Sequence, residues 1–408
     1  MRQLFIAVVI AIFLSSCKKD DPAVTQTPAV TLPWESGQSA NAVLGRPNFT
    51  LNGTDSVSQS TIPGPWGLAI ASTGALFVVD QKAHRILRFD NATTKPTGAS
   101  ADGVLGQHSF SVRVWNDSAG GSTPSATGFE TPTAVALDPA GNLFVVDQAN
   151  QRVLRFNAAS SKANGAAADG VLGQSTFTSS SFKTTQNGFF SPQGIATDAA
   201  GNLYVADGSN HRVLRFNNAA SKANGANADG VLGQPDFTTN KKDSTATTMS
   251  NPTSLAVDAA GNLYVGERGN SRILIFLNAA SKPNGASADI VLGKPTFTSG
   301  STPSAANRGA IYLPYALATD AQNNLYVADG AYNRVLVFYN APSKKNGDSA
   351  DVVIGKKDFI HASVTAAAAD NVGQPYGVAV HSSTGTLFIS DYSNSRILRF
   401  QAKNALTP

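Results

Sequence analysis

One block of about 60 residues recurs six times and accounts for most of this 408-residue chain. Its clearest part reads GNLYVADGSNHRVLRF around Asp207, and each of the other copies has an acidic residue at the same position. These marker residues are Asp80, Asp147, Asp207, Glu267, Asp329 and Asp391. Such a period is typical of one supersecondary unit copied in series, with each unit burying its apolar surface against its neighbours. The repeat therefore constrains the architecture strongly and the chemistry very little.

The repeat contains four short β-rich runs, of which the sixth copy has only the first three. In the third copy they are residues 194–197, 203–207, 213–216 and 231–232, and Asp198–Asn202 has the composition of a tight turn. Counted from the proline that precedes the first run, the third residue is small and the fifth is alanine in all six copies. Strands that converge on one axis need such small side chains, and four antiparallel strands per repeat are typical of a propeller blade. We predict an all-β, six-bladed β-propeller of four-stranded antiparallel blades.

The two ends of the chain indicate how the ring closes. Residues 39–49 match the SADGVLGQPDF block that ends the other units, whereas the sixth unit lacks this block and stops soon after Phe400. Without it, the last blade would expose an unpaired edge. We therefore predict that the N-terminal strand completes the last blade.

The recurring pattern P-x-G-I-A-x-D…G-N-L-Y-V-A-D-x-x-N-x-R-V resembles the NHL repeat, whose members form six-bladed β-propellers. The resemblance covers residues 39–402, although these units are longer than usual NHL repeats. The family includes RNA-binding proteins, a copper-containing lyase and bacterial surface proteins. The resemblance therefore implies a fold and not an activity.

The first 16 residues are predicted to be a lipoprotein signal peptide. Arg2 precedes an apolar stretch at residues 4–14 that is too short to span a bilayer comfortably. Ser15 and Ser16 then lead to Cys17, the only cysteine in the chain, in a pattern that resembles the bacterial lipobox. We predict that Cys17 is lipidated and anchors the protein to a membrane. The alternative is an ordinary signal peptide followed by an unmodified cysteine.

Residues 17–38 are predicted to be a flexible tether, and residues 403–408 a C-terminal tail. The run Lys18–Asp21 resembles an export signal that places lipoproteins of some Gram-negative bacteria on the outer leaflet, although a solvated tether explains it equally. The expected location is the Gram-negative cell envelope, as an outer-membrane lipoprotein that is exposed at the cell surface. Lys and Arg recur singly and the net charge is only +4, so we expect no nucleic-acid partner.

An acidic residue and an arginine five positions later recur in every copy. The pairs are Asp80 with Arg85, Asp147 with Arg152, Asp207 with Arg212, Glu267 with Arg272, Asp329 with Arg334 and Asp391 with Arg396. Because catalytic carboxylates need environments that differ, six near-identical pairs are interpreted as structural clamps. The five histidines fall in four different slots without the convergence that a metal site needs. We predict no catalytic residue, no metal ligand and no cofactor.

The residues that open the innermost strands differ between copies. They are Trp66, Thr133, Gln193, Thr253, Tyr315 and Tyr376. In a closed ring the three aromatic residues would be neighbours, and the other three would form a polar half. Aromatic faces beside hydrogen-bonding groups suit a glycan, a peptide or another amphipathic ligand. The alternative is that these rings only pack beneath the inter-blade loops.

Three functions are compatible with the sequence. The first is a lipid-anchored, non-enzymatic binding module for a glycan, a peptide or a protein of the cell envelope, with its ligand on the loop-rich face around the channel. The second is an extracytoplasmic metal-dependent hydrolase or lyase with its site in the central channel. The third is a structural scaffold in a cell-envelope assembly. Enzymatic activity is left open.

Overall fold

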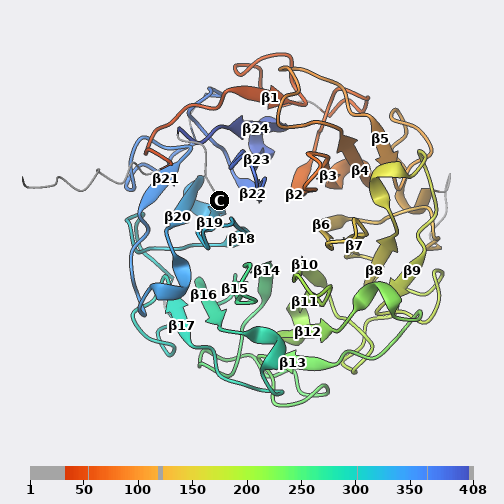
Figure 1. Cartoon of the computed structure of the whole chain (residues 1–408), viewed down its shortest axis with the longest axis vertical. Coiled ribbons are helices and arrows are strands. Elements are labelled where there is room, and N and C mark those ends of the chain that lie inside the picture. The colour runs from red at the N-terminus through yellow and green to blue at the C-terminus, as the bar shows by residue number, and fades with distance from the viewer. Residues whose placement is uncertain (1–32, 54, 118–122, 301, 365, 404–408) are drawn as a thin grey trace, which may run out of the picture. The chain divides into compact units, whose positions relative to one another are not determined.

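The computed structural model describes residues 33–53, 55–117, 123–300, 302–364 and 366–403. In this part of the chain, six four-stranded antiparallel sheets surround a central axis as the blades of a propeller (Figure 1). The predicted all-β, six-bladed fold is therefore confirmed. The predicted signal peptide (1–16), Cys17 and the tether as far as residue 32 lie outside the described residues, as do residues 404–408 of the predicted tail.

The strands of each blade run from the axis outward. Blade one contains β2 (Pro65–Ile70), β3 (Leu76–Asp80), β4 (Arg85–Phe89) and β5 (Gly103–Leu105). Blade two contains β6 (Pro132–Leu137), β7 (Leu143–Asp147), β8 (Arg152–Phe156) and β9 (Gly170–Leu172). Blade three contains β10 (Pro192–Thr197), β11 (Leu203–Asp207), β12 (Arg212–Phe216) and β13 (Gly230–Leu232).

The second half of the ring repeats this order. Blade four contains β14 (Pro252–Val257), β15 (Leu263–Glu267), β16 (Arg272–Phe276) and β17 (Ile290–Leu292). Blade five contains β18 (Pro314–Thr319), β19 (Leu325–Asp329), β20 (Arg334–Phe338) and β21 (Val352–Ile354). Blade six contains β22 (Pro375–Val380), β23 (Leu387–Asp391), β24 (Arg396–Phe400) and, as its outermost strand, β1 (Ala42–Leu44).

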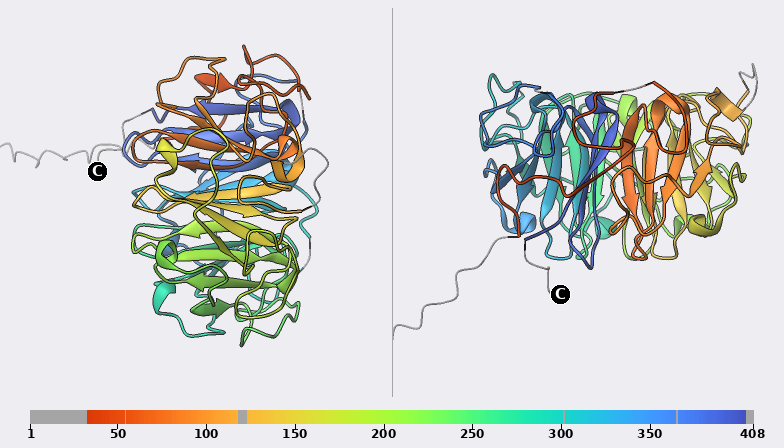
Figure 2. Two further views of the ribbon diagram at one scale, coloured as in Figure 1. Left: turned by 90° about the vertical axis from the view of Figure 1, so that its right-hand side faces the viewer. Right: turned by 90° about the horizontal axis from the view of Figure 1, so that it is seen from above.

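The antiparallel order sorts the connections onto two faces (Figure 2). One face, called the loop face here, carries the long connections from each outermost strand to the next innermost strand and the turns between second and third strands. The opposite face, called the turn face, carries the tight turns between first and second strands and the loops between third and fourth strands. The loop face therefore surrounds the start of every innermost strand.

The predicted tight turn lies on the turn face. Asp138 accepts hydrogen bonds through Oδ1 from the backbone N–H groups of Ala140 and Asn142, both at 2.9 Å. Gly141 follows with a φ of 80°, which glycine adopts without strain. Asp198, Asp258 and Asp320 make the same pair of bonds in blades three to five. A local side-chain bond therefore ends the innermost strand in each of these blades.

The hydrophobic core lies between neighbouring blades. Between blades one and two, Phe77 and Val79 pack in one buried cluster with Val135 and Val145. The small residues near the axis have a steric cause, because adjacent innermost strands approach closely there. A Cβ atom added at Gly67 would lie 2.7 Å from the carbonyl oxygen of Thr133 in the next blade.

The N-terminal strand closes the ring as predicted. Strand β1 pairs antiparallel with β24, with Ala42 opposite Arg399 and Leu44 opposite Ile397. The following segment adds a second link, because Arg396 donates a hydrogen bond from Nη1 to the backbone carbonyl of Phe49. Blade six is therefore completed by residues from both ends of the propeller.

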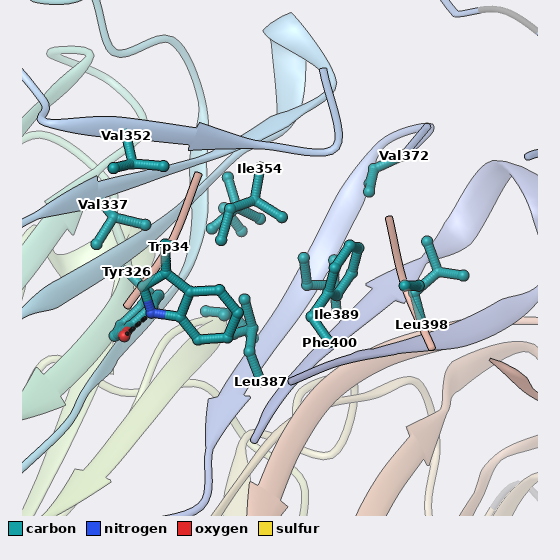
Figure 3. Close-up of a cluster of buried hydrophobic side chains, with 14 of the residues drawn as sticks. Trp34, Tyr326, Val337, Val352, Ile354, Val372, Leu387, Ile389, Leu398 and Phe400 are labelled. Atoms are coloured by element: carbon teal, nitrogen blue, oxygen red, sulfur yellow. Dashed lines mark hydrogen bonds between the residues drawn. The ribbon is translucent and has the colours of Figure 1, made fainter. Parts of the chain in front are cut away.

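The predicted boundary between tether and propeller at residues 38 and 39 is too late. Trp34 is only 1% exposed and packs between blades five and six, beside Tyr326 and Leu387 (Figure 3). Its indole Nε1 donates to the Tyr326 hydroxyl at 2.7 Å. Lys403 also donates its backbone N–H to the Pro33 carbonyl at 3.0 Å. The compact unit therefore begins at Pro33, because burial of an indole fixes this segment to the core.

Among the residues between 33 and 403 that the structure describes, no helix has the length and apolar character needed to cross a membrane. The apolar stretch at residues 4–14 lies outside this part of the chain.

Candidate binding site on the loop face

A β-bulge places each of the six ring residues at the channel mouth. In blade two, Pro132 pairs with Asp147 and Ala134 pairs with Val146, so Thr133 is an extra residue without a partner in β7. The same break follows the first residue of every innermost strand. A bulge re-aims the side chain of its extra residue, and all six ring residues line one axial cavity of about 50 Å³.

The aromatic members of the ring pack against one another. The ring centroids of Trp66 and Tyr376 lie 4.2 Å apart, and those of Tyr315 and Tyr376 lie 4.4 Å apart in a T-shaped contact. All three side chains are half-buried. Burial, with the Tyr315 phenol as a second cause, raises the pKa of Tyr376 above its usual range. The three rings therefore form one half-buried aromatic surface at the mouth of the channel.

The polar members of the ring are used mainly within the scaffold. Thr133 is buried and donates from Oγ1 to the carbonyl oxygen of Gln193 at 2.9 Å. Thr253 is also buried, and its Oγ1 donates to the carbonyl oxygen of Pro314 at 3.1 Å. Each hydroxyl therefore links two adjacent innermost strands. Of the three polar residues, only Gln193 keeps a half-exposed side chain.

Tyr392 extends the aromatic surface and was not identified from the sequence. It begins the 3₁₀ turn η9 (Tyr392–Asn394), and its ring centroid lies 4.7 Å from that of Tyr376 and 5.7 Å from that of Trp66. The Lys82 ammonium lies 5.4 Å from the Tyr392 centroid, within range of a cation–π contact. We call Trp66, Tyr315, Tyr376 and Tyr392 the aromatic cluster.

A departure from the repeat marks the position of Tyr392. It follows the acidic marker of blade six, where blades three and five have Gly208 and Gly330. A Cβ atom at Gly330 would lie 2.2 Å from Cδ2 of Tyr315, so that glycine makes room for the Tyr315 ring. Comparison of this one position between copies would therefore have found Tyr392.

The acid–arginine pairs hold the loops that carry the site. In blade three, Arg212 donates from Nε to Asp207 at 2.8 Å and from Nη2 to the carbonyl oxygens of Thr185 and Gly188. Its Nη1 donates to the carbonyl of Phe237 in the loop that leaves the blade. Both side chains are 0% exposed, as they are in the other five pairs. Each pair is therefore a buried node that joins the loops entering and leaving one blade.

The same carboxylates fix the backbone just before the innermost strands. Asp207 accepts the N–H of Phe190 at 2.6 Å, two residues before Pro192. Burial raises the pKa of Asp207 and of Asp329 to about 6, against the opposing effect of the arginine beside each. Both remain ionised at neutral pH, when the pairs are charge-assisted hydrogen bonds.

Two histidines form bonds between blades. His84 accepts the backbone N–H of Thr131 through Nδ1 at 3.2 Å, and His211 accepts that of Asn251 at 3.1 Å. In each case the donor directly precedes the proline that opens the next innermost strand. Within the described residues, no three His, Cys, Asp or Glu side chains come together in a group that could hold a metal ion.

Large hydrophobic side chains are also exposed on the loop face. Phe182 and Phe190 stack with ring centroids 4.8 Å apart. The ring centroids of Trp115 and His84 lie 6.2 Å apart in a T-shaped arrangement. In the part of the chain that the structure describes, the exposed large hydrophobic residues are Leu51, Trp115, Phe182, Phe190, Ile360 and Val364. All six belong to connections that enter an innermost strand, and thus to the loop face.

The sequence, the fold and this geometry define a six-bladed β-propeller with a variable loop face. The family model of the NHL repeat matches residues 189–216 and 249–276, which contain the first three strands of blades three and four. Two of the six repeats thus match the NHL repeat that the sequence pattern resembles. No curated protein matches the chain.

Several solved structures match the chain at low sequence identity. A structural genomics protein of unknown function from Bacteroides thetaiotaomicron VPI-5482 is 12% identical, with a TM-score of 0.50 over 91% of this chain and 75% of that one. Hydrazine synthase from Kuenenia stuttgartiensis is 13% identical, with a TM-score of 0.48 over 86% and 97%. Virginiamycin B lyase from Staphylococcus aureus is 11% identical, with a TM-score of 0.43 over 85% and 87%. At 12% identity the likeness to the Bacteroides protein concerns the fold alone.

Proposed function

We propose that this protein is a lipid-anchored, extracytoplasmic NHL-repeat propeller that acts as a non-enzymatic binding module. One observation carries the proposal: at equivalent positions around the channel mouth, blades five, six and one supply a cluster of aromatic rings that the other blades lack. Blade architecture does not require these rings, because blades two to four are built without them. Residues that differ between otherwise equal copies are therefore the candidates for recognition.

The aromatic cluster favours a glycan, a peptide or an envelope protein as the ligand. Its rings are half-buried, and the Arg268 guanidinium lies 5.8 Å from the Tyr315 centroid. Partly exposed aromatic faces next to cationic groups contribute apolar contact area and orient polar groups of a ligand. No nucleic-acid partner is proposed, because the basic residues do not gather in runs.

The proposed anchor is compatible with a loop face that is free to bind. Pro33 and Lys403 are hydrogen-bonded to each other beyond the end of β24, on the turn face. A chain attached to a membrane through Cys17 would therefore enter the propeller on the side opposite the aromatic cluster. We propose the outer membrane of a Gram-negative bacterium as the location. Cys17→Ser should release the protein into the soluble fraction, and unchanged membrane fractionation would contradict lipidation.

The binding role is tested by removing three rings at once. We expect Trp66→Ala, Tyr315→Ala and Tyr376→Ala together to abolish binding of ligands found on glycan, peptide and protein arrays, since the stacking surface is lost. Phe182→Ser with Phe190→Ser is the matched control, because it removes two exposed rings from the same face that do not line the axial cavity. Circular dichroism should show that both variants stay folded.

Other outcomes would reverse the proposal. If the wild-type protein binds nothing on the arrays, the aromatic cluster is only packing beneath the loops. Stoichiometric metal in the purified protein would favour a metal-dependent hydrolase or lyase. Stable co-purifying envelope proteins, held equally by the triple variant, would favour a structural scaffold.

A further inference from the structure

We infer that a groove at the seam between blades six and one is a binding site for a neutral saccharide. The inference rests on the proposed function and names the ligand class of the loop face. The groove has a volume of about 340 Å³ and is called the seam groove here. It is lined by Gly53, Asp55, Lys82, Gln374, Tyr392, Ser393 and Ser395.

The seam groove has a much larger volume than the axial cavity. Pockets that hold small ligands usually have volumes of roughly 300–1,000 Å³. The axial cavity, at about 50 Å³, has room for a few water molecules but not for a sugar ring. The seam groove falls within the usual range, and Tyr392 joins it to the aromatic cluster. A ligand can therefore bind beside the cluster without any movement of Trp66 or Tyr376.

The groove presents the contacts that a sugar ring uses. Tyr392 is half-buried and supplies an aromatic side chain against which the C–H groups of a pyranose can pack. Lys82 and Asp55 form an ion pair at 3.2 Å, with side chains 36% and 75% exposed. A solvent-accessible pair of this kind contributes little to stability, so its partners can exchange it for ligand contacts. Adjacent sugar hydroxyls would donate to the Asp55 carboxylate and accept from the Lys82 ammonium.

Two further polar side chains flank this pair. Ser393 donates from Oγ to Oε1 of Gln374 at 3.2 Å, and both residues are exposed. The bond orients the Gln374 amide, which offers both a donor and an acceptor. The groove therefore matches the alternating donors and acceptors of a polyhydroxylated ligand.

The charge balance favours a ligand without net charge. Asp55 and Lys82 are the charged residues among those that line the groove, and they are of opposite sign. An anionic ligand would meet the Asp55 carboxylate, whereas a cationic ligand would meet the Lys82 ammonium. A neutral saccharide is repelled by neither of these charged groups.

The groove residues are departures from the repeat. The position of Lys82 holds Ala149, Ser209, Gly269, Ala331 and Ser393 in the other blades. The position of Tyr392 holds Gln81, Gln148, Gly208, Arg268 and Gly330. Asp55 lies in the connection from β1 to β2, which belongs to the seam between blades six and one. Since the other five seams between blades form without this combination, the scaffold does not explain it.

The experiment compares two charge-neutral pairs on the loop face. The full chain is titrated by calorimetry with cellotetraose, maltotetraose and N-acetylchitotetraose, and separately with the acidic tetragalacturonate. We expect at least one neutral tetrasaccharide to bind, and Asp55→Asn with Lys82→Gln to weaken that binding by about tenfold or more. The matched control is Lys241→Gln with Asp243→Asn, which removes another partly exposed pair, at 3.0 Å, from a loop of the same face. The control should bind like the wild type.

Several results would overturn the inference. They are no binding of any neutral tetrasaccharide, equal affinity in the seam variant, or tighter binding of tetragalacturonate than of every neutral probe. Because Asp55 is exposed and Lys82 is partly exposed, thermal unfolding of the seam variant should match that of the control. A match excludes misfolding as the cause of lost binding. A ligand that needs Trp66, Tyr315 and Tyr376 but not the seam pair would leave the proposed function intact and refute only the saccharide site.

Discussion

The two faces of the propeller are built from the same six repeats, yet the turn face repeats its contacts from blade to blade and the loop face does not. On the turn face the lysines of the third-to-fourth loops each pair with an aspartate seven residues later, at 2.7 to 2.9 Å. These pairs are Lys95–Asp102, Lys162–Asp169, Lys222–Asp229, Lys282–Asp289 and Lys344–Asp351. On the loop face the connections differ in sequence from blade to blade and expose hydrophobic side chains. Repetition therefore serves the blade, whereas variation marks a surface available to a partner.

A boundary between these roles lies just beneath the loop face. The acid–arginine pairs, at the junction of second and third strands, are repeated and fully buried, whereas the ring residues on the innermost strands differ between blades. Substitutions in the layer of acid–arginine pairs should therefore reduce stability, and substitutions in the layer of ring residues should reduce binding. Both layers depend on the closure of the ring between blades six and one.

The largest effect is expected from deleting residues 39–50. This deletion removes β1, leaves the outer edge of β24 unpaired and takes away the carbonyl of Phe49 that Arg396 binds. Blade six then lacks its outermost strand, and the ring is no longer closed. We therefore expect the cooperative unfolding transition to be lost or to move to a much lower temperature. Differential scanning calorimetry measures this. An unchanged transition would show that the propeller does not need its closure.

A large effect is also expected from removing one member of a buried pair. Arg212→Met should reduce the free energy of unfolding by about 3–5 kcal/mol, because it leaves the Asp207 carboxylate buried without its counter-charge. The control is Arg215→Met in the same strand, since Arg215 is only half-buried and donates to backbone carbonyls of the next blade. Denaturant titration compares the two variants. A loss at Arg212 no larger than that at Arg215 would contradict the role of the pair as a node.

The division between repeated and variable residues also explains what the sequence could predict. Strand number and blade order follow from patterns that recur in the copies, and closure follows from the block that the sixth copy lacks and residues 39–49 supply. The structure has all three features as predicted. Six copies act as internal replicates, so a small residue such as Gly67 is interpreted correctly from its recurrence. Trp34 occurs once, outside any repeat, and its burial between blades five and six depends on the distant Tyr326. A one-time contact of this kind leaves no pattern in the sequence.

The candidate site was only partly predictable, for the same reason. The six ring residues were identified from their shared position, but the pattern could not show that the hydroxyls of Thr133 and Thr253 bond to the next blade. Nor could it show that Lys82 approaches Tyr392, because the two lie in blades one and six. Such contacts arise when the ring closes. They depend on the angle between blades, which the linear sequence does not state.

The smallest predicted effect concerns the two histidines that join neighbouring blades. Burial, helped by Arg113 near His84 and by Lys242 near His211, lowers the pKa of both imidazoles below the usual 6.5. As the pH falls, the unfolded chain takes up protons first. Their stabilising contribution is therefore complete above pH 6.5 and is lost as the pH falls through the lower folded-state pKa values. Thermal unfolding should show a modest decrease in Tm over this range.

Asparagine at both positions should remove this part of the pH dependence. In blade five Asn333 occupies the same slot, has a φ of 54° and accepts the N–H of Gln374 at 2.9 Å. His84→Asn with His211→Asn should therefore keep the inter-blade bonds and the Tm at neutral pH, since asparagine tolerates this backbone conformation. The difference in Tm between neutral and mildly acidic buffer should shrink relative to the wild type. If the difference is unchanged, other groups cause the acid sensitivity, and the histidines serve only as acceptors that asparagine replaces.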